Sequence, residues 1–120
     1  MMKNEIITIN KTPNGSIFSY VDSQIIQIEY KNIFLCFHKD DFKNFRNFIN
    51  NLDIDYMEKV NVNLYNKRKI IIQMKNSKIK IVFNKSEFQE FYELINFKKY
   101  YEKKQEFEKF YLDLKIFSDN

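Results

Sequence analysis

The sequence predicts an α+β fold in which helices cover one face of an antiparallel β-sheet. Short runs of β-branched residues end at polar turn residues, which is typical of strands. Apolar residues then recur at intervals of three and four, which is typical of helices with one buried face. This strand-then-helix pattern occurs twice, so we expect an internal duplication.

The two copies align without a gap at a constant offset of 46 residues. Nine of the 25 positions from 25–49 are identical to their counterparts in 71–95. Two copies are too few for a solenoid, which needs at least about three stacked units. We therefore expect the copies, about 14–52 and 60–97, to pack against each other in a single domain that spans residues 1–120.

Each copy begins with a predicted β-hairpin. In the first copy the strands are Ile25–Tyr30 and Ile33–Phe37, and in the second they are Ile70–Met74 and Ile79–Phe83. Polar residues separate the two strands of each pair, which indicates a turn.

A helix is predicted after each hairpin. Asn84 can accept from the first-turn amides and Glu87, three residues later, can reach back, which is the pattern of a capping box. His38 and Asp41 occupy the equivalent places in the first copy. The apolar stripes of the two helices are Phe42, Phe45, Ile49 and Leu52 in the first, and Phe88, Phe91, Tyr92 and Ile95 in the second.

Three further strands complete the prediction. Two of them, Glu5–Ile9 and Ile17–Val21, flank a turn at 13–15, which holds the only Pro and Gly of the chain. The third, Val60–Tyr65, alternates apolar and polar residues. The expected order is therefore ββββα-βββα, with residues 50–59 as a loop or as an extension of the first helix.

The helical pattern continues past Ile95 without a breaking residue. Its apolar stripe rotates by about a quarter turn, so we expect a bend or a short break within 96–101. We predict a C-terminal helical extension over 98–117, which either packs on its own domain or pairs with the same segment of a second subunit.

Several short motifs are spread over most of residues 5–97. They are N-G-x-I at Asn14, Gly15 and Ile17, I-x-I-x-Y-x-N-I from Ile26 to Ile33, F-x-x-x-D-F-x-x-F from Phe37 to Phe45, N-x-R-x-I at Asn66, Arg68 and Ile70, and E-F at Glu87 and Phe88. With these motifs the chain resembles a family of small bacterial proteins classed as a domain of unknown function. Because the motifs are mainly core and cap positions, the resemblance implies the fold and no activity.

Four neighbouring residues, Cys36, His38, Asp40 and Asp41, offer the ingredients of thiol catalysis. Their counterparts in the second copy are Val82, Asn84, Ser86 and Glu87, which read as a core residue, a helix cap and first-turn residues. We therefore expect Cys36 to be a buried small hydrophobe and His38 to be an N-cap.

The remaining signatures of enzymes are missing from the sequence. One glycine cannot form a phosphate-binding loop, and one His with one Cys cannot form a zinc site. The acidic pairs Asp53 with Asp55 and Asp40 with Asp41 lie on polar segments, where we expect them to be solvated. We predict that the chain is not an enzyme and has no catalytic, cofactor or metal site.

The formal net charge of +4 raises the alternative of a nucleic-acid-binding module. Its contacts would come from a Lys-rich surface with aromatic stacking, at Lys67, Arg68, Lys69, Lys98, Lys99, Tyr100 and Tyr101. Glutamates alternate with the C-terminal lysines, however, which is typical of a solvated helix face.

We favour a small non-enzymatic domain that binds a protein partner or a second copy of itself. The 13 Phe and 8 Tyr are generous for one core of this size and could leave an apolar contact patch. The N-terminus has no apolar stretch of the length that a secretory signal needs, and the single cysteine has no partner within the chain, so we expect a cytoplasmic protein without a membrane segment.

Overall fold

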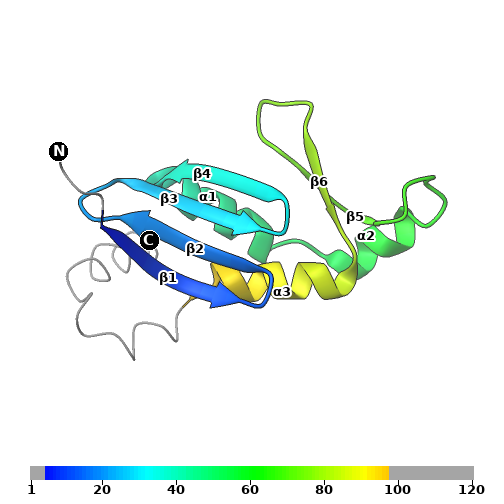
Figure 1. Ribbon diagram of the computed structural model, residues 1–120. Coiled ribbons are helices and arrows are strands. Elements are labelled where there is room, and N and C mark those ends of the chain that lie inside the picture. Colours follow the sequence, from blue (N-terminus) through cyan, green and yellow to red (C-terminus); the bar gives the residue numbers. More distant parts are fainter. Residues whose placement is uncertain (1–4, 98–120) are drawn as a thin grey trace.

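The computed structural model describes residues 5–97, which form two antiparallel sheets and three helices (Figure 1). The elements in chain order are β1 (Ile6–Thr12), β2 (Gly15–Tyr20), β3 (Ile25–Tyr30), β4 (Ile33–His38), α1 (Lys39–Asn50), α2 (Ile54–Val60), β5 (Ile70–Gln73), β6 (Lys80–Phe83) and α3 (Lys85–Ile95). The α+β class and the antiparallel sheet with helices on one face are confirmed.

The larger sheet has the order β1-β2-β3-β4, so each strand pairs with its neighbour in sequence. Gly15 begins β2 at a point where the chain is crowded: a Cβ there would lie 2.8 Å from the Glu29 carbonyl oxygen and 2.9 Å from Leu94 Cδ2. The single glycine of the chain is therefore required for close packing between β2, β3 and α3.

Two helices cover the same face of this sheet, α3 against β1 and β2 and α1 against β3 and β4 (Figure 1). The predicted apolar stripes face the sheet, and Phe42, Phe88 and Phe91 are buried. Leu52, the last residue of the first predicted stripe, lies outside the helix because α1 ends at Asn50. The Phe91 ring contacts the rings of Tyr30, Phe45 and Phe83, with centroids 5.1 to 6.2 Å apart. One aromatic cluster therefore joins the sheet, α1, α3 and the second hairpin.

Both predicted caps are confirmed. Asn84 and Glu87 form a reciprocal capping box at the start of α3, and His38 Nδ1 accepts from the Asp40 amide at the start of α1. These side chains satisfy amides that have no partner within the helix.

The second hairpin does not join the larger sheet. The strands β5 and β6 form a separate two-stranded sheet that stands beside the start of β4 (Figure 1). The duplication is not confirmed, and the hairpins differ in register. In the first, Ile26 pairs with Phe37, whereas Phe83, the counterpart of Phe37, pairs with Ile70 and not with Ile72.

The predicted strand Val60–Tyr65 is wrong. Asp53 caps a short helix, α2, that ends at Val60, and turns and bends follow up to Lys67. The alternating side chains Val62 and Leu64 are exposed because no neighbouring strand offers them a face to cover. The observed order is ββββα-αββα: a loop or an extension of α1 is predicted over residues 50–59, whereas most of them belong to the separate helix α2.

The helix α3 ends at Ile95, and the predicted extension over 98–117 lies outside the described residues. Among residues 5–97, no helix is both long enough and apolar enough to cross a membrane.

Candidate protein-interaction site

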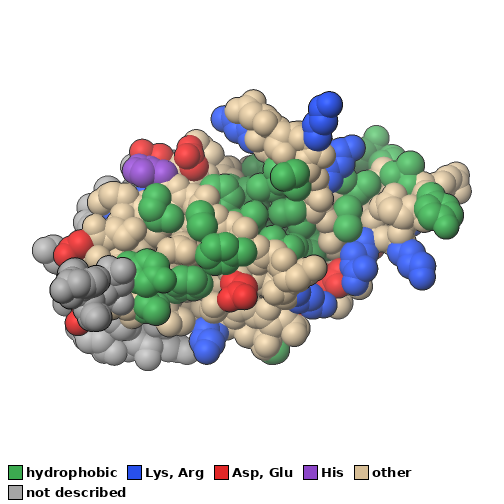
Figure 2. Space-filling view, turned by 45° about the horizontal axis from the view of Figure 1, so that its top comes forward, with side chains coloured by type: hydrophobic (Ala, Val, Ile, Leu, Met, Phe, Trp, Pro, Cys, Tyr) green, Lys and Arg blue, Asp and Glu red, His purple; other side chains and the backbone are tan. Residues whose placement is uncertain are grey.

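A groove opens between the larger sheet and the β5–β6 hairpin (Figure 2). We call it the inter-sheet groove. Its lining consists of residues 30–35 from the end of β3 to the first half of β4, of Met74, Ser77 and residues 79–83 from the hairpin, and of Arg68 and Glu87.

The walls of the groove are apolar and incompletely covered. On β4, Ile33 and Leu35 are half-buried and Phe34 is 56% exposed, whereas the inward residues of the neighbouring β3 are fully buried. On the other wall, Ile79 is 65% exposed. Figure 2 shows apolar side chains gathered in this hollow beside the hairpin. Exposed apolar surface in a concave site is typical of contact surfaces.

Both walls come from edge strands. Among the strands of residues 5–97, β4 pairs only with β3, and β6 pairs only with β5. Alternate backbone amides and carbonyls of an edge strand point away from its partner and are free to pair with another extended chain.

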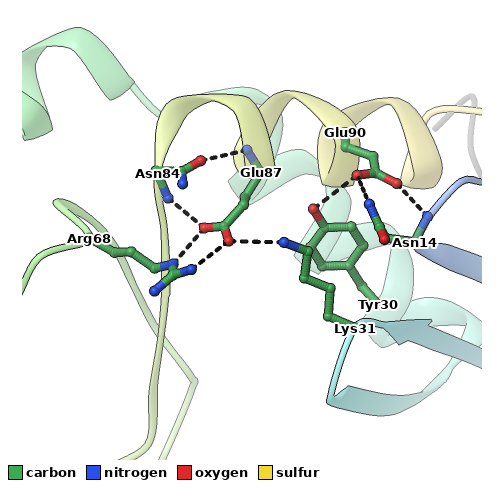
Figure 3. Close-up of polar contacts among 7 residues, drawn as sticks. All are labelled: Asn14, Tyr30, Lys31, Arg68, Asn84, Glu87 and Glu90. Atoms are coloured by element: carbon green, nitrogen blue, oxygen red, sulfur yellow. Dashed lines mark hydrogen bonds and ion pairs between the residues drawn. The ribbon is translucent and has the colours of Figure 1, made fainter.

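Glu87 lies in the groove lining and holds three segments together (Figure 3). Its side chain is 8% exposed and accepts from Arg68 Nε at 2.7 Å, Arg68 Nη2 at 2.8 Å and Lys31 Nζ at 3.1 Å. The Asn84 amide donates to the same carboxylate at 2.8 Å. The hydrogen bond from Arg68 lowers the pKa of Glu87 to about 2, and burial, which acts in the opposite direction, is outweighed. The start of α3, the loop before β5 and the turn after β3 are thereby fixed relative to one another.

One helical turn further along α3, Glu90 holds two of the three hairpin turns of the larger sheet, those after β1 and after β3 (Figure 3). It accepts from the backbone and side-chain amides of Asn14, at 2.8 and 2.9 Å, and from the Tyr30 hydroxyl at 3.2 Å. Burial and the neighbouring Glu90 charge raise the pKa of Tyr30 to about 12. The sheet wall of the groove is therefore positioned by α3, as is the hairpin wall.

The chain around the hairpin is strongly basic. Residues 59–86 contain eight Lys and Arg and no Asp or Glu. Three of the eight make contacts within the described part of the chain: Arg68 with Glu87, Lys85 with Asp55, and Lys69 with the carbonyls of Leu64 and Asn66. The other five are exposed and form no ion pair within residues 5–97; they are Lys59, Lys67, Lys75, Lys78 and Lys80.

The structure separates the predicted contact residues. Lys67 is exposed on the loop before β5, while Arg68 binds Glu87 and Lys69 donates to its own loop. The other four, Lys98, Lys99, Tyr100 and Tyr101, lie outside the described residues. The sequence prediction missed the groove, although the absence of acidic residues from 59–86 was a readable signal.

The prediction for Cys36 is wrong, because the thiol is exposed. Along β4 the odd-numbered residues Ile33, Leu35 and Phe37 face inward, so Cys36 faces outward and contacts the Gln27 side chain at 3.9 Å. Within residues 5–97, no group of three or more His, Cys, Asp or Glu is placed to hold a metal ion.

Comparison with known proteins agrees with the resemblance described from the motifs. No curated protein and no solved structure matches the chain. A family model covers residues 1–117, nearly the whole sequence. The chain therefore belongs to the family of unknown function DUF6686.

Proposed function

We propose that this protein is a non-enzymatic cytoplasmic interaction domain that binds a protein partner in the inter-sheet groove. The observation that carries the proposal is the pair of exposed apolar walls, Phe34 on β4 and Ile79 next to β6, presented by two separate sheets. An apolar segment bound between them would be removed from water on two sides, which favours binding in proportion to the buried area.

The rigid base of the groove supports this function. Glu87 and Glu90 tie α3 to both walls, so the groove is formed before a partner arrives. A preformed site loses less conformational entropy on binding than a flexible one.

A nucleic-acid-binding module is the second candidate, and the basic stretch 59–86 favours it. Tyr65 lies within this stretch and is fully exposed, so it could stack on a base. However, Arg68 is already bound to Glu87, which occupies the one guanidinium of the stretch that could grip a phosphate bidentately.

Selection from a library of random twelve-residue peptides displayed on phage tests the proposal. The full chain is the bait, and Ile79→Asp is the groove variant. The matched control is Ile6→Asp, because Ile6 is similarly exposed on an edge strand and lies outside the groove lining. Thermal unfolding first verifies that both variants fold.

We expect peptides that bind the wild-type chain and Ile6→Asp but not Ile79→Asp. If no selected peptide depends on Ile79, the groove is not a protein-binding site and the proposal fails.

A further inference from the structure

We propose that the partner segment is an extended, acidic polypeptide, in which aliphatic side chains fill the inter-sheet groove and carboxylates pair with Lys78 and Lys80 of the hairpin. This inference rests on the proposed function and adds the chemistry of the ligand.

The basic residues of the described chain are concentrated around the β5–β6 hairpin. Residues 5–58 carry five basic and eight acidic side chains, and residues 87–97 carry three acidic and no basic ones. All eight basic residues of 59–86 therefore stand between two segments with an acidic excess. Acidic and basic residues are therefore concentrated in different parts of the chain, and the basic part, residues 59–86, contains the hairpin and the loop before it.

Two of the lysines without an ion pair within residues 5–97, Lys78 and Lys80, lie at the inter-sheet groove. Lys80 lines the inter-sheet groove, and Lys78 lies in the hairpin turn directly before Ile79. Both are exposed and have no acidic partner within residues 5–97. Carboxylates at the rim of an apolar groove would pair with them, and rim charges of this kind set orientation and association rate.

The backbone of the walls indicates an extended segment. Because β4 and β6 are both edge strands, a partner chain in β conformation can add main-chain hydrogen bonds to either one. An alternating sequence would then send apolar side chains into the groove and acidic ones toward the lysines.

The lining favours a polypeptide over a nucleic acid. Most of the exposed wall is aliphatic, from Ile33, Leu35, Ile79 and Val82, while the rings of Tyr30 and Phe83 are buried. Bases need exposed aromatic faces for stacking, and Phe34 is the exposed ring of this lining. The C-terminal residues 98–120 do not match the ligand, since they carry six Lys against five Asp or Glu.

The composition of the selected peptides provides the test. Peptides whose binding depends on Ile79 are synthesised with a fluorescein label, and their dissociation constants are measured by anisotropy on the full chain. The charge variant is Lys78→Glu/Lys80→Glu. The matched control is Lys11→Glu/Lys59→Glu, which changes the net charge equally at two exposed residues outside the groove lining.

We expect the Ile79-dependent peptides to be enriched in Asp and Glu alternating with Val, Ile and Leu. Lys78→Glu/Lys80→Glu should weaken them at least about tenfold at low salt, and the control should weaken them by less than about threefold. This inference is overturned if the Ile79-dependent peptides are not enriched in acidic residues, or if both double variants weaken their affinity equally. Either result leaves the proposed function standing. Absence of any Ile79-dependent peptide overturns both.

Two further measurements identify other occupants. Micromolar binding of fluorescein-labelled dT20 or A20 RNA that is lost in Lys78→Glu/Lys80→Glu would overturn the inference in favour of nucleic acid. A dimer in chromatographic light scattering that dissociates in Ile79→Asp would assign the groove to a second copy of the chain and overturn it likewise.

Discussion

Asn50 and Asn96 donate hydrogen bonds to each other: each side-chain amide nitrogen binds the other side-chain oxygen, at 3.0 and 2.9 Å. The two residues are 46 positions apart, which is the offset of the sequence repeat. Phe45 and Phe91 are also 46 positions apart, and the centroids of their rings lie 6.2 Å from each other. Only residues that lie at a two-fold axis contact their own equivalents. The hairpin registers do not share such an axis, so the two contacts join α1 to α3 without confirming that the helices are copies.

The asparagine pair should show energetic coupling. Asn50→Ala removes both bonds of the pair, and Asn96→Ala removes the same two bonds together with the one to the Tyr92 carbonyl. A double-mutant cycle by urea unfolding should therefore give a coupling free energy of about 0.5–1.5 kcal/mol. Strictly additive losses would show that the pair contributes nothing.

Glu87 should make the stability of the protein depend on pH below about 4.5. Its pKa in the folded chain is about 2, below its value of about 4.3 in an unfolded chain. The contribution of its ionised form is therefore fully present above the unfolded pKa and is lost as the pH falls toward 2. Glu87→Gln should lower the free energy of unfolding by about 1–3 kcal/mol at pH 7, with a difference that shrinks toward pH 2.

Urea unfolding between pH 2 and pH 7 measures this difference. The control is Glu93→Gln, an exposed position on the same helix, for which we expect a change below about 0.5 kcal/mol. A Glu87→Gln penalty that stays constant down to pH 2 would contradict the assignment.

Gly15→Ala should destabilise the fold, since the added methyl would overlap the Glu29 carbonyl and Leu94. We expect a loss of about 1–3 kcal/mol in chemical unfolding, in the range of overpacked cores. If Gly15→Ala is as stable as wild type, β2 does not approach α3 as closely as described.

Phe42→Ala and Phe88→Ala should each cost about 3–5 kcal/mol of unfolding free energy, because both rings are almost fully buried between helix and sheet. Phe48→Ala on α1 is the matched control, since Phe48 is 47% exposed, and it should cost less than about 1 kcal/mol. A silent Phe42→Ala or Phe88→Ala in thermal unfolding would mean that the stripe is wrongly assigned.

Cys36 should react with a thiol reagent in the native protein. Ellman's reagent should titrate one thiol per chain without denaturant, and Cys36→Ser should change the free energy of unfolding by less than about 0.5 kcal/mol, because the side chain lies on the open face of β4. Reaction only after unfolding would place the thiol in the core.

The sequence predicts most reliably the features that depend on residues close to one another along the chain. The capping box of Asn84 and Glu87 and the stripe from Phe88 to Ile95 follow from spacing alone, and both are confirmed. The alternation from Val60 to Tyr65 failed because a strand also needs a partner strand, which spacing does not report.

Contacts between distant segments explain the remaining errors. The sequence predicts Cys36 in the core because its apolar neighbours mask the alternation of β4. The pairing of Arg68 with Glu87 joins a loop to a helix start and has no local signature, so the sequence predicts Arg68 as a contact for a ligand. The inter-sheet groove likewise exists because β5 and β6 pair with each other and not with the larger sheet. This pairing cannot be read from the sequence of either strand alone.

The separation of charge between the hairpin and the rest of the molecule has a kinetic consequence. Within residues 5–97 it gives an electric dipole moment, with the positive pole at the β5–β6 hairpin, which carries Lys75, Lys78 and Lys80. A partner with a negative surface would turn the molecule during diffusion so that the hairpin meets it first. Ionic strength would therefore act mainly on how often productive encounters occur, while the lifetime of the complex would depend on the aliphatic walls of the groove.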